Sequence, residues 1–346
     1  EGFPRTALRE ITSLRCLKGN KYIINLDSVV TTEDKDIYLI FDYCEYDLHG
    51  LLSSNSQIPY LHILSYIYQA LEGLKSIHEH FLHRDIKPAN IMLTAKNELK
   101  IGDFGFTRIY KQGNGSRPLT NNVMTQLYRP PELCLGETKY STEVDVWSLG
   151  CTFYEMLTRN SLFRDGNTDT ALLGKIFDIC GTPNEHLWNK WEHLPNAPLF
   201  IRSIKSNSTL RQYLDNDTTN QDPNDRTNET LPFDELVHQY VKITGEEQEN
   251  KEKALKTFFI ELLVGMLELD PRKRKSCQEC LDLMNELIFN NDYFKSDIDK
   301  ILNPEKLEPL ELEEIHLKRQ YKQKKFKRDP DFFNEVRPAR IFPSGS

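Results

Sequence analysis

The chain has 346 residues with 44 lysines and arginines against 52 aspartates and glutamates, so its formal net charge is −8. This length predicts two packed lobes with a tail rather than one small core. The acidic balance argues against nonspecific nucleic-acid binding by the whole chain, because that binding needs clustered basic residues opposite phosphates. We expect no direct specific nucleic-acid binding either. No apolar run is long enough to span a membrane, and the first twenty residues carry charge throughout. We therefore expect neither a membrane anchor nor a signal peptide.

The N-terminal quarter alternates between helical and strand-like patterns. Apolar residues recur at helical spacing in residues 4–16, and Pro4 suits a helix start. Two β-like runs follow, at residues 22–30 and 36–43, separated by a polar turn. Residues 60–80 then repeat apolar side chains every three or four positions, which predicts one long amphipathic helix.

Loop chemistry dominates residues 81–132, where short apolar pieces alternate with Gly, Pro and Asn. An Asn-rich insertion lies at about residues 205–250, and its centre has almost no apolar side chains. We expect a solvated loop there, because such a segment cannot bury a core. Further helices are predicted at residues 142–157, 168–180 and 254–269.

The C-terminal segment carries a basic run, Lys318 to Arg328, in which seven of eleven residues are lysine or arginine. One interpretation is a solvated tail or helix face. The other is nuclear import or contact with an acidic partner. The sequence does not decide between them.

Two short motifs stand close together after the long helix. The first is HRDIKPAN at residues 83–90, and the second is Asp-Phe-Gly at residues 103–105, with Pro-Pro-Glu beyond at residues 130–132. Each triplet alone is a weak signal. In this order and at this spacing, they predict a site for phosphoryl transfer. That reaction needs an oriented hydroxyl, fixed metal ions and neutralised charge rather than covalent chemistry from the protein.

The residue types suit these tasks. Asp85 would accept the proton of the attacking hydroxyl, and Lys87 would reach the transferring phosphate. Asn90 lies five residues beyond Asp85 and can turn back within the same loop to hold a magnesium ion. Asp103 would supply a second hard oxygen ligand, which magnesium prefers while it keeps waters and substrate oxygens.

With these motifs the sequence resembles the eukaryotic protein kinases. PRTALRE, Pro4 to Glu10, is similar to the cyclin-binding helix of the cyclin-dependent kinases. The preceding Glu1-Gly2-Phe3 and the segment FDYCEYDLHGLL, residues 41–52, resemble the transcription-elongation branch, which phosphorylates the C-terminal repeat of RNA polymerase II. The resemblance covers about residues 1–200 and resumes at LELDPRKR, residues 267–274.

The resemblance implies an α+β, protein kinase-like bilobal fold in three parts. Residues 1–42 would be the remnant of the small lobe, residues 43–296 the mainly helical large lobe, and residues 297–346 a C-terminal extension. Missing upstream are the Gly-rich loop, the phosphate-binding lysine and three of the five small-lobe strands. We therefore expect a fragment or an incompletely represented chain.

The resemblance also implies a function. It implies ATP and Mg²⁺ as cofactors, protein substrates with Ser/Thr-Pro sites, a cyclin bound through the Pro4–Glu10 helix, an upstream activating kinase and a nuclear location. Glu10 would pair with the missing lysine. Leu14, Leu26, His83 and Phe104 would stack as a spine anchored by Asp145. The residues expected at ATP are Phe41, at the back of the adenine pocket, Asp42 and Cys44, through backbone hydrogen bonds, and Asp47 and Asp103.

The family's activation loop places Thr120 at the activating phosphorylation site. Arg9, Arg84 and Arg108 match the arginines that receive the phosphate. A phosphate carries about −1.5 to −2 charges and three acceptor oxygens, so three guanidinium groups could order the loop around it. Three unrelated surface arginines are the alternative.

Other loop residues also match the family. Thr125 would bond to Asp85 and Lys87 and would complete the catalytic set with Asn90. A proline pocket after the target residue would be formed by Val123, Met124 and Arg129. Glu132 would form a buried structural pair with Arg274.

Two other functions stay open. A truncated or pseudokinase-like binding module for a cyclin or scaffold would explain the missing lysine and glycines, but a dead enzyme has no chemical need of the retained Asp85, Lys87, Asn90 and Asp103. A mitogen-activated kinase would work without a cyclin. Such kinases usually place tyrosine two residues before the loop threonine, where this chain has Pro118. We therefore favour cyclin dependence.

Overall fold

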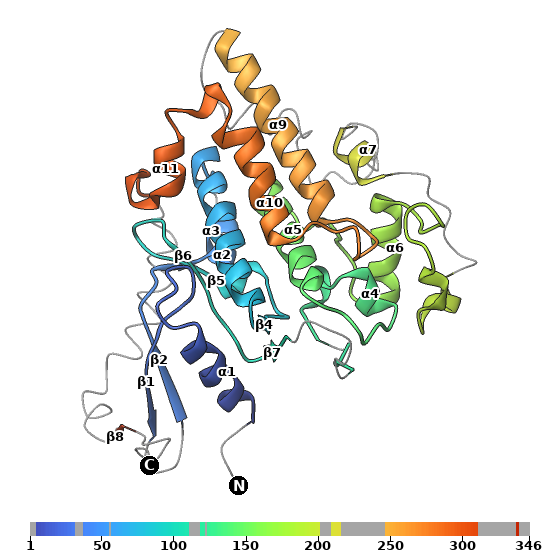
Figure 1. The fold of residues 1–346 in the computed structure, drawn as a ribbon, viewed down its shortest axis with the longest axis horizontal. Helices are drawn as coiled ribbons and strands as arrows, with labels where there is room; N and C mark the ends of the chain where they lie inside the picture. The colour runs from blue at the N-terminus through green and yellow to red at the C-terminus, as the bar shows by residue number, and fades with distance from the viewer. Residues whose placement is uncertain are drawn as a thin grey trace.

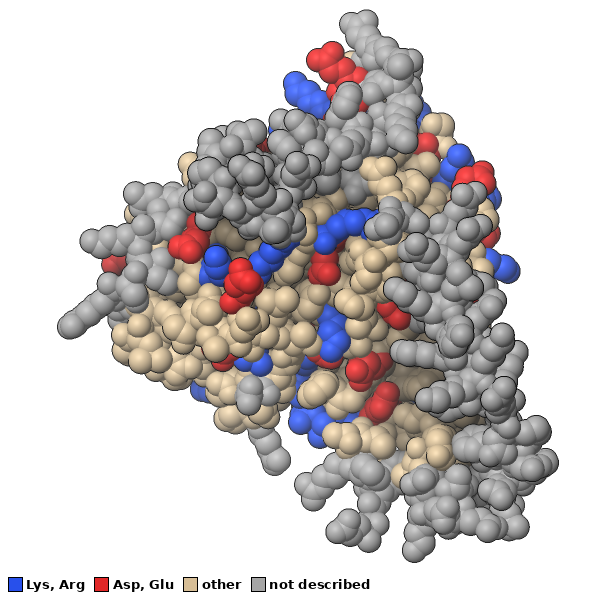
Figure 2. All heavy atoms as spheres, turned by 180° about the vertical axis from the view of Figure 1, so that it is seen from behind, with Lys and Arg blue, Asp and Glu red and all other residues tan. Residues whose placement is uncertain are grey.

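The computed structural model describes residues 5–31, 37–54, 57–110, 118–121, 123–200, 209–215, 246–310 and 337–338. Figure 1 shows one helix and a β-ribbon at one end of the molecule and the longer helices packed side by side in the rest. In the described ranges, no helix is both long and apolar enough to cross a membrane. Figure 2 shows acidic and basic side chains interspersed over the described surface of the opposite face.

The small end consists of α1 (Arg5–Cys16) beside an antiparallel pair, β1 (Leu26–Thr31) and β2 (Ile37–Phe41). The pair contains a register shift between Leu26 and Ser28. On the other edge of β1 lies β8 (Arg337–Pro338). The helix buries Ile11 and Leu14, which share one face at a spacing of three residues.

The large part is built around α5 (Glu143–Thr158), whose residues are buried on almost every side. A helix that is apolar all round needs neighbours on all sides, and α3 (Tyr60–His78) and α9 (Glu246–Met266) supply two of them. Between α5 and α9, Phe153 meets Phe259 edge-on at 5.6 Å between ring centroids. The next helix, α10 (Cys277–Met284), packs on α3 and α9.

Short elements carry the connections between these helices. One sheet has the order β3-β5-β6 and pairs β3 (Tyr46–Asp47), which precedes α3, with β5 (Ile91–Leu93) and β6 (Leu99–Ile101) from beyond it. A two-stranded sheet pairs β4 (Phe81–Leu82) with β7 (Arg108–Ile109). The 3₁₀ turns include Pro88–Asn90, Gln126–Tyr128, Trp191–His193, Ala197–Leu199, Asp292–Phe294 and Pro304–Lys306, and a π turn spans Asn285–Phe289. The remaining elements are α2 (Leu48–Leu52), α4 (Pro131–Cys134), α6 (Asp169–Cys180), α7 (Leu210–Asp215) and α11 (Ile298–Leu302).

The helices predicted at residues 4–16, 60–80, 142–157 and 168–180 are confirmed as α1, α3, α5 and α6. Two boundaries were wrong. Helix α9 begins at Glu246 rather than near residue 254. The prediction missed its first turns because they are mostly charged and show no apolar stripe. The first β-like run becomes a strand only at Leu26, while Ile23 makes a single bridge to Ile101. Pro4, most of the Asn-rich insertion and the basic run lie outside the described residues.

Candidate active site

The loop after β4 is anchored to α5 by Asp145, a fully buried residue of that helix. Its two carboxylate oxygens accept the backbone N–H groups of His83 at 2.8 Å and Arg84 at 2.7 Å, and His78 Nε2 lies 3.0 Å from Oδ2. Burial alone would raise the pKa of Asp145, but these partners, His78 foremost, lower it below its ordinary value. Arg84 has a φ of 68°, a left-handed conformation that these bonds stabilise.

One network surrounds the carboxylate of Asp85. Lys87 Nζ donates to Oδ2 at 2.7 Å, and Thr125 donates to Oδ1 through its hydroxyl at 3.0 Å and its amide at 3.2 Å. Lys87 Nζ also donates to Thr125 Oγ1 at 2.8 Å. Burial raises the pKa of Asp85, but the bonds from Lys87, Thr125 and Asn90 outweigh it, and the net pKa is lowered. The predicted catalytic residues are therefore brought together around an ionised carboxylate.

Two oxygen ligands are available for a metal ion beside this network. Asn90 Nδ2 donates to the backbone oxygen of Asp85 at 2.8 Å and to its Oδ2 at 2.9 Å, which leaves Asn90 Oδ1 as the atom for a cation. Asp103 is exposed, and its backbone takes a left-handed φ of 60°. Burial lowers the pKa of His83, and the charges of Asp145, Asp85 and Asp103 oppose this effect. An amide oxygen and a carboxylate fit Mg²⁺, which is usually held by few protein ligands plus phosphates.

The helix α1 approaches this site through Glu10 and Leu14. The pKa of Glu10 is raised by burial and by the charge of Asp103, while a hydrogen bond from the backbone of Phe104 lowers it. Leu14 is buried in the main core, and Phe104 meets His83 edge-on with ring centroids 5.0 Å apart. A carboxylate with a raised pKa next to Asp103 is a place where a lysine cation would be stabilising.

Four of the residues expected at ATP lie at the end of β2 or just after it. Phe41 and Cys44 are half-buried and pack against the core. Asp42 donates its N–H to Asn25 O at 3.2 Å, so a ligand would meet its carbonyl oxygen. Asp47 Oδ1 accepts Gly50 N–H at 2.7 Å and caps α2. Asp47 therefore has a structural role in addition to the ligand contact predicted for it.

The three arginines predicted to receive a phosphate lie close to one another. Burial and the charge of Arg84 lower the pKa of Arg9, and burial, Arg84 and Arg9 lower that of Arg108. Arg84 is only 1% exposed, so three unrelated surface arginines do not describe this cluster. Thr120 is exposed. Its carbonyl oxygen accepts the hydroxyl of Tyr140 at 2.6 Å, a contact that the sequence did not indicate.

The predicted proline pocket is shaped by Arg129. Its Nε donates to Val123 O at 3.1 Å and its Nη2 to Met124 O at 3.2 Å, while Met124 takes a left-handed φ of 75°. Its Nη1 donates to Asp169 Oδ1 at 2.5 Å, and Gln126 Nε2 donates to the same oxygen at 2.6 Å. Sequence reasoning missed Asp169. Its position in the first turn of α6 is explained by the helix alone, so no pattern pointed to this contact.

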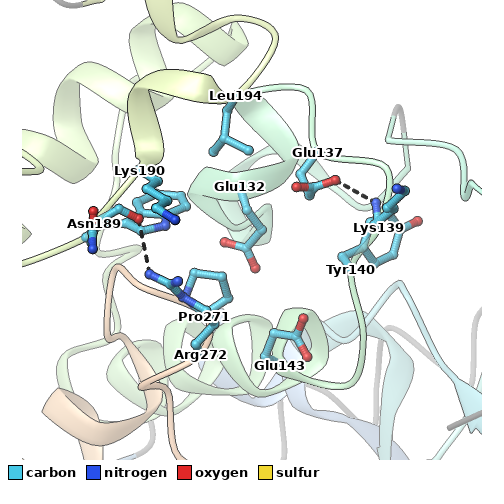
Figure 3. Close-up of a pocket in the computed structure, with 11 residues that line it drawn as sticks. Glu132, Glu137, Lys139, Tyr140, Glu143, Asn189, Lys190, Leu194, Pro271 and Arg272 are labelled. Atoms are coloured by element: carbon cyan, nitrogen blue, oxygen red, sulfur yellow. Dashed lines mark hydrogen bonds between the residues drawn. The ribbon is translucent and has the colours of Figure 1, made fainter. Parts of the chain in front are cut away.

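Glu132 and Arg274 form a two-bond pair with distances of 2.7 and 3.0 Å. Arg274 also donates to the carbonyls of Glu268 and Glu143, and its guanidinium lies 4.9 Å from the centroid of the Trp147 ring. Figure 3 shows the Glu132 carboxylate facing a cavity of about 370 Å³, which Tyr140 also lines. Of the two partners, Glu132 lines this cavity.

Comparisons with known proteins support the resemblance. A family model described as protein kinase domain matches residues 1–284. Cyclin-dependent kinase G1 of Arabidopsis thaliana is 42% identical over 205 residues, covering 57% of this chain and 32% of the relative. Cyclin-dependent kinase 12 of Drosophila melanogaster is 35% identical over 292 residues, covering 81% and 22%. A serine/threonine-protein kinase of Debaryomyces hansenii is 42% identical over 219 residues, covering 57% and 36%.

A solved structure is also similar. The crystal structure of the yeast RNA Pol II CTD kinase CTDK-1 complex matches with a TM-score of 0.65 and 29% identity, over 85% of this chain and 82% of that chain. The chain spans between 22% and 36% of the length of the three curated relatives. The predicted kinase fold and the resemblance to cyclin-dependent kinases are confirmed. The chain belongs to the protein kinase family, through a protein kinase domain that occupies most of its length.

Proposed function

We propose that the protein is a cyclin-dependent serine/threonine kinase. It transfers the γ-phosphate of ATP to Ser or Thr followed by proline, with the C-terminal repeat of RNA polymerase II as its substrate. The observation that carries the proposal is the network in which Lys87, Thr125 and Asn90 all contact the Asp85 carboxylate. A carboxylate held in this way is ionised and has a fixed orientation, and a general base for phosphoryl transfer needs both.

The roles of the residues follow from their contacts. Asp85 accepts the proton of the substrate hydroxyl as that oxygen bonds to the γ-phosphorus, while the bond from this phosphorus to the β–γ bridging oxygen breaks and ADP leaves. Lys87 bridges Asp85 and Thr125 and offers positive charge at the same point. Asn90 and Asp103 hold the metal ions, and bound Mg²⁺ neutralises charge on the phosphates. Phe41, Asp42, Cys44 and Asp47 contact the nucleotide.

The cyclin would cover α1 and the start of the activation segment. Leu8 on α1 is 39% exposed, and Phe106 and Ile109 are 46% and 68% exposed. Large apolar side chains on neighbouring elements are typical of a surface that a partner buries. An upstream kinase would phosphorylate Thr120, which is exposed beside the arginines. We place the protein in the nucleus, where its substrate is.

The test uses the full-length protein purified with its cyclin. With ATP and Mg²⁺ we expect it to phosphorylate a peptide of the polymerase repeat at serine before proline, measured by mass spectrometry. No transfer to this peptide or to a general Ser-Pro peptide, together with retained cyclin binding, would favour the binding module instead. Activity without any partner would contradict cyclin dependence.

Asp169 should affect the choice of proline. Its carboxylate holds Arg129, which in turn holds the carbonyls of Val123 and Met124. We expect Asp169→Ala to reduce the preference for Ser-Pro over Ser-Ala peptides, as a ratio of kcat/KM, by about tenfold, which is the 1–3 kcal/mol range of one lost specificity contact. Asp178→Asn, on an exposed part of the same helix, is the control. An unchanged ratio in Asp169→Ala would exclude this role.

A further inference from the structure

The hydroxyl of Tyr140 joins two parts of the activation machinery. It accepts a hydrogen bond from Arg84 Nη1 at 2.9 Å and donates one to the carbonyl oxygen of Thr120 at 2.6 Å. We propose that Tyr140 is a positioning residue that holds the segment around Thr120 beside the arginine cluster before any phosphate is present. The proposal deepens the proposed function and rests on Thr120 being the phosphorylated residue.

The bridge is buried and aligned at both ends. Tyr140 is 6% exposed, and Arg84 is held from its other side by the carbonyl of Phe106, which accepts from Nε at 2.9 Å. Arginine has five N–H donors, so two bonds leave donors of Arg84 for a phosphate. Burial keeps the pKa of Tyr140 above its ordinary value, although Arg84 opposes this, so the phenol stays protonated and can donate.

A second contact fixes the same segment. Leu119 donates its N–H to Thr138 O at 2.9 Å, and its side chain packs against a small buried cluster that includes Tyr140. Residues 138–140 therefore bind two successive loop residues: Thr138 binds Leu119, and Tyr140 binds Thr120. Tyr140 also lines the cavity of Figure 3.

The anchor does not depend on a phosphate. The Tyr140 hydroxyl binds the backbone carbonyl of Thr120, whereas a phosphate would be attached to the exposed side chain of that residue. Without phosphate, Arg9, Arg84 and Arg108 repel one another, and a neutral hydroxyl can still hold the loop there. Activation by phosphorylation should then be graded, with the unphosphorylated enzyme keeping part of its activity.

The first test measures hydrogen exchange in the unphosphorylated chain and needs no kinase activity. We expect Tyr140→Phe to speed amide exchange in residues 119–121 by about tenfold, because the loop opens more often. The matched control is Tyr66→Phe, which removes another buried tyrosine hydroxyl, bonded to Asn97 Oδ1 at 3.0 Å and remote from the loop. Thermal melts confirm that both variants fold. Equal exchange in Tyr140→Phe and the wild type would overturn the proposal.

The second test is a double-mutant cycle in the full-length protein with its cyclin. In a Thr120→Ala background, we expect Tyr140→Phe to lower kcat/KM by at least tenfold. In the phosphorylated protein, we expect less than threefold, since the phosphate then holds the loop. The same loss in both backgrounds would mean a merely structural tyrosine and would overturn the proposal. Failure of the proposed kinase activity would stop only this second test, so the two failures are distinguishable.

Discussion

Replacing Asp85 by asparagine is expected to lower the turnover of the full-length kinase by about 10²- to 10⁴-fold, the range for loss of a general base. The amide has the shape of the carboxylate but cannot accept the hydroxyl proton. Binding of nucleotide should change little, because Asn90 and Asp103 remain. The measurement is kcat on a Ser-Pro peptide, with nucleotide affinity determined separately.

The control is Asp282→Asn, an exposed aspartate on α10 that accepts from Gln278 at 2.8 Å. It should leave kcat unchanged. Wild-type turnover in Asp85→Asn would show that another group takes the proton. The pH profile gives a further check. Since the pKa of Asp85 is lowered, kcat should hold as the pH falls below neutral and decline only as the pH passes through that lowered pKa.

Residues close in sequence could be predicted, because a single loop fixes their geometry. Asp85, Lys87 and Asn90 lie within six positions, and the structure places them in one network. Long helices could also be predicted from their apolar repeats, as for α3 and α5. Both features depend on local spacing that is visible in the chain.

Contacts between distant elements could not be predicted. Asp169 reaches Arg129 across 40 positions, and Tyr140 reaches Arg84 across 56, and each residue has an ordinary local explanation as a helix-start acid or an aromatic core residue. The partners are decided by packing of α4, α5 and α6, which no short pattern encodes. The charged start of α9 was missed for the related reason that its neighbours, rather than its own sequence, stabilise it.

The pair between Glu132 and Arg274 should have the largest effect on stability. Both side chains are at most 1% exposed, so removing the guanidinium leaves a buried carboxylate without its partner. We expect Arg274→Met to lower the free energy of unfolding by about 3–5 kcal/mol. The measurement is the urea midpoint of the chain followed by circular dichroism.

Arg211 provides a matched control, because it forms an arginine–glutamate pair that is exposed to solvent. It pairs with Glu261 at 2.8 Å, and the two side chains are 46% and 38% exposed, so Arg211→Met should cost no more than about 1 kcal/mol. Adding Glu132→Gln to Arg274→Met should recover part of the loss, because the buried charge is then removed. If Arg274→Met cost no more than Arg211→Met, water would have to reach Glu132 from the cavity of Figure 3, and the pair would not be a buried one.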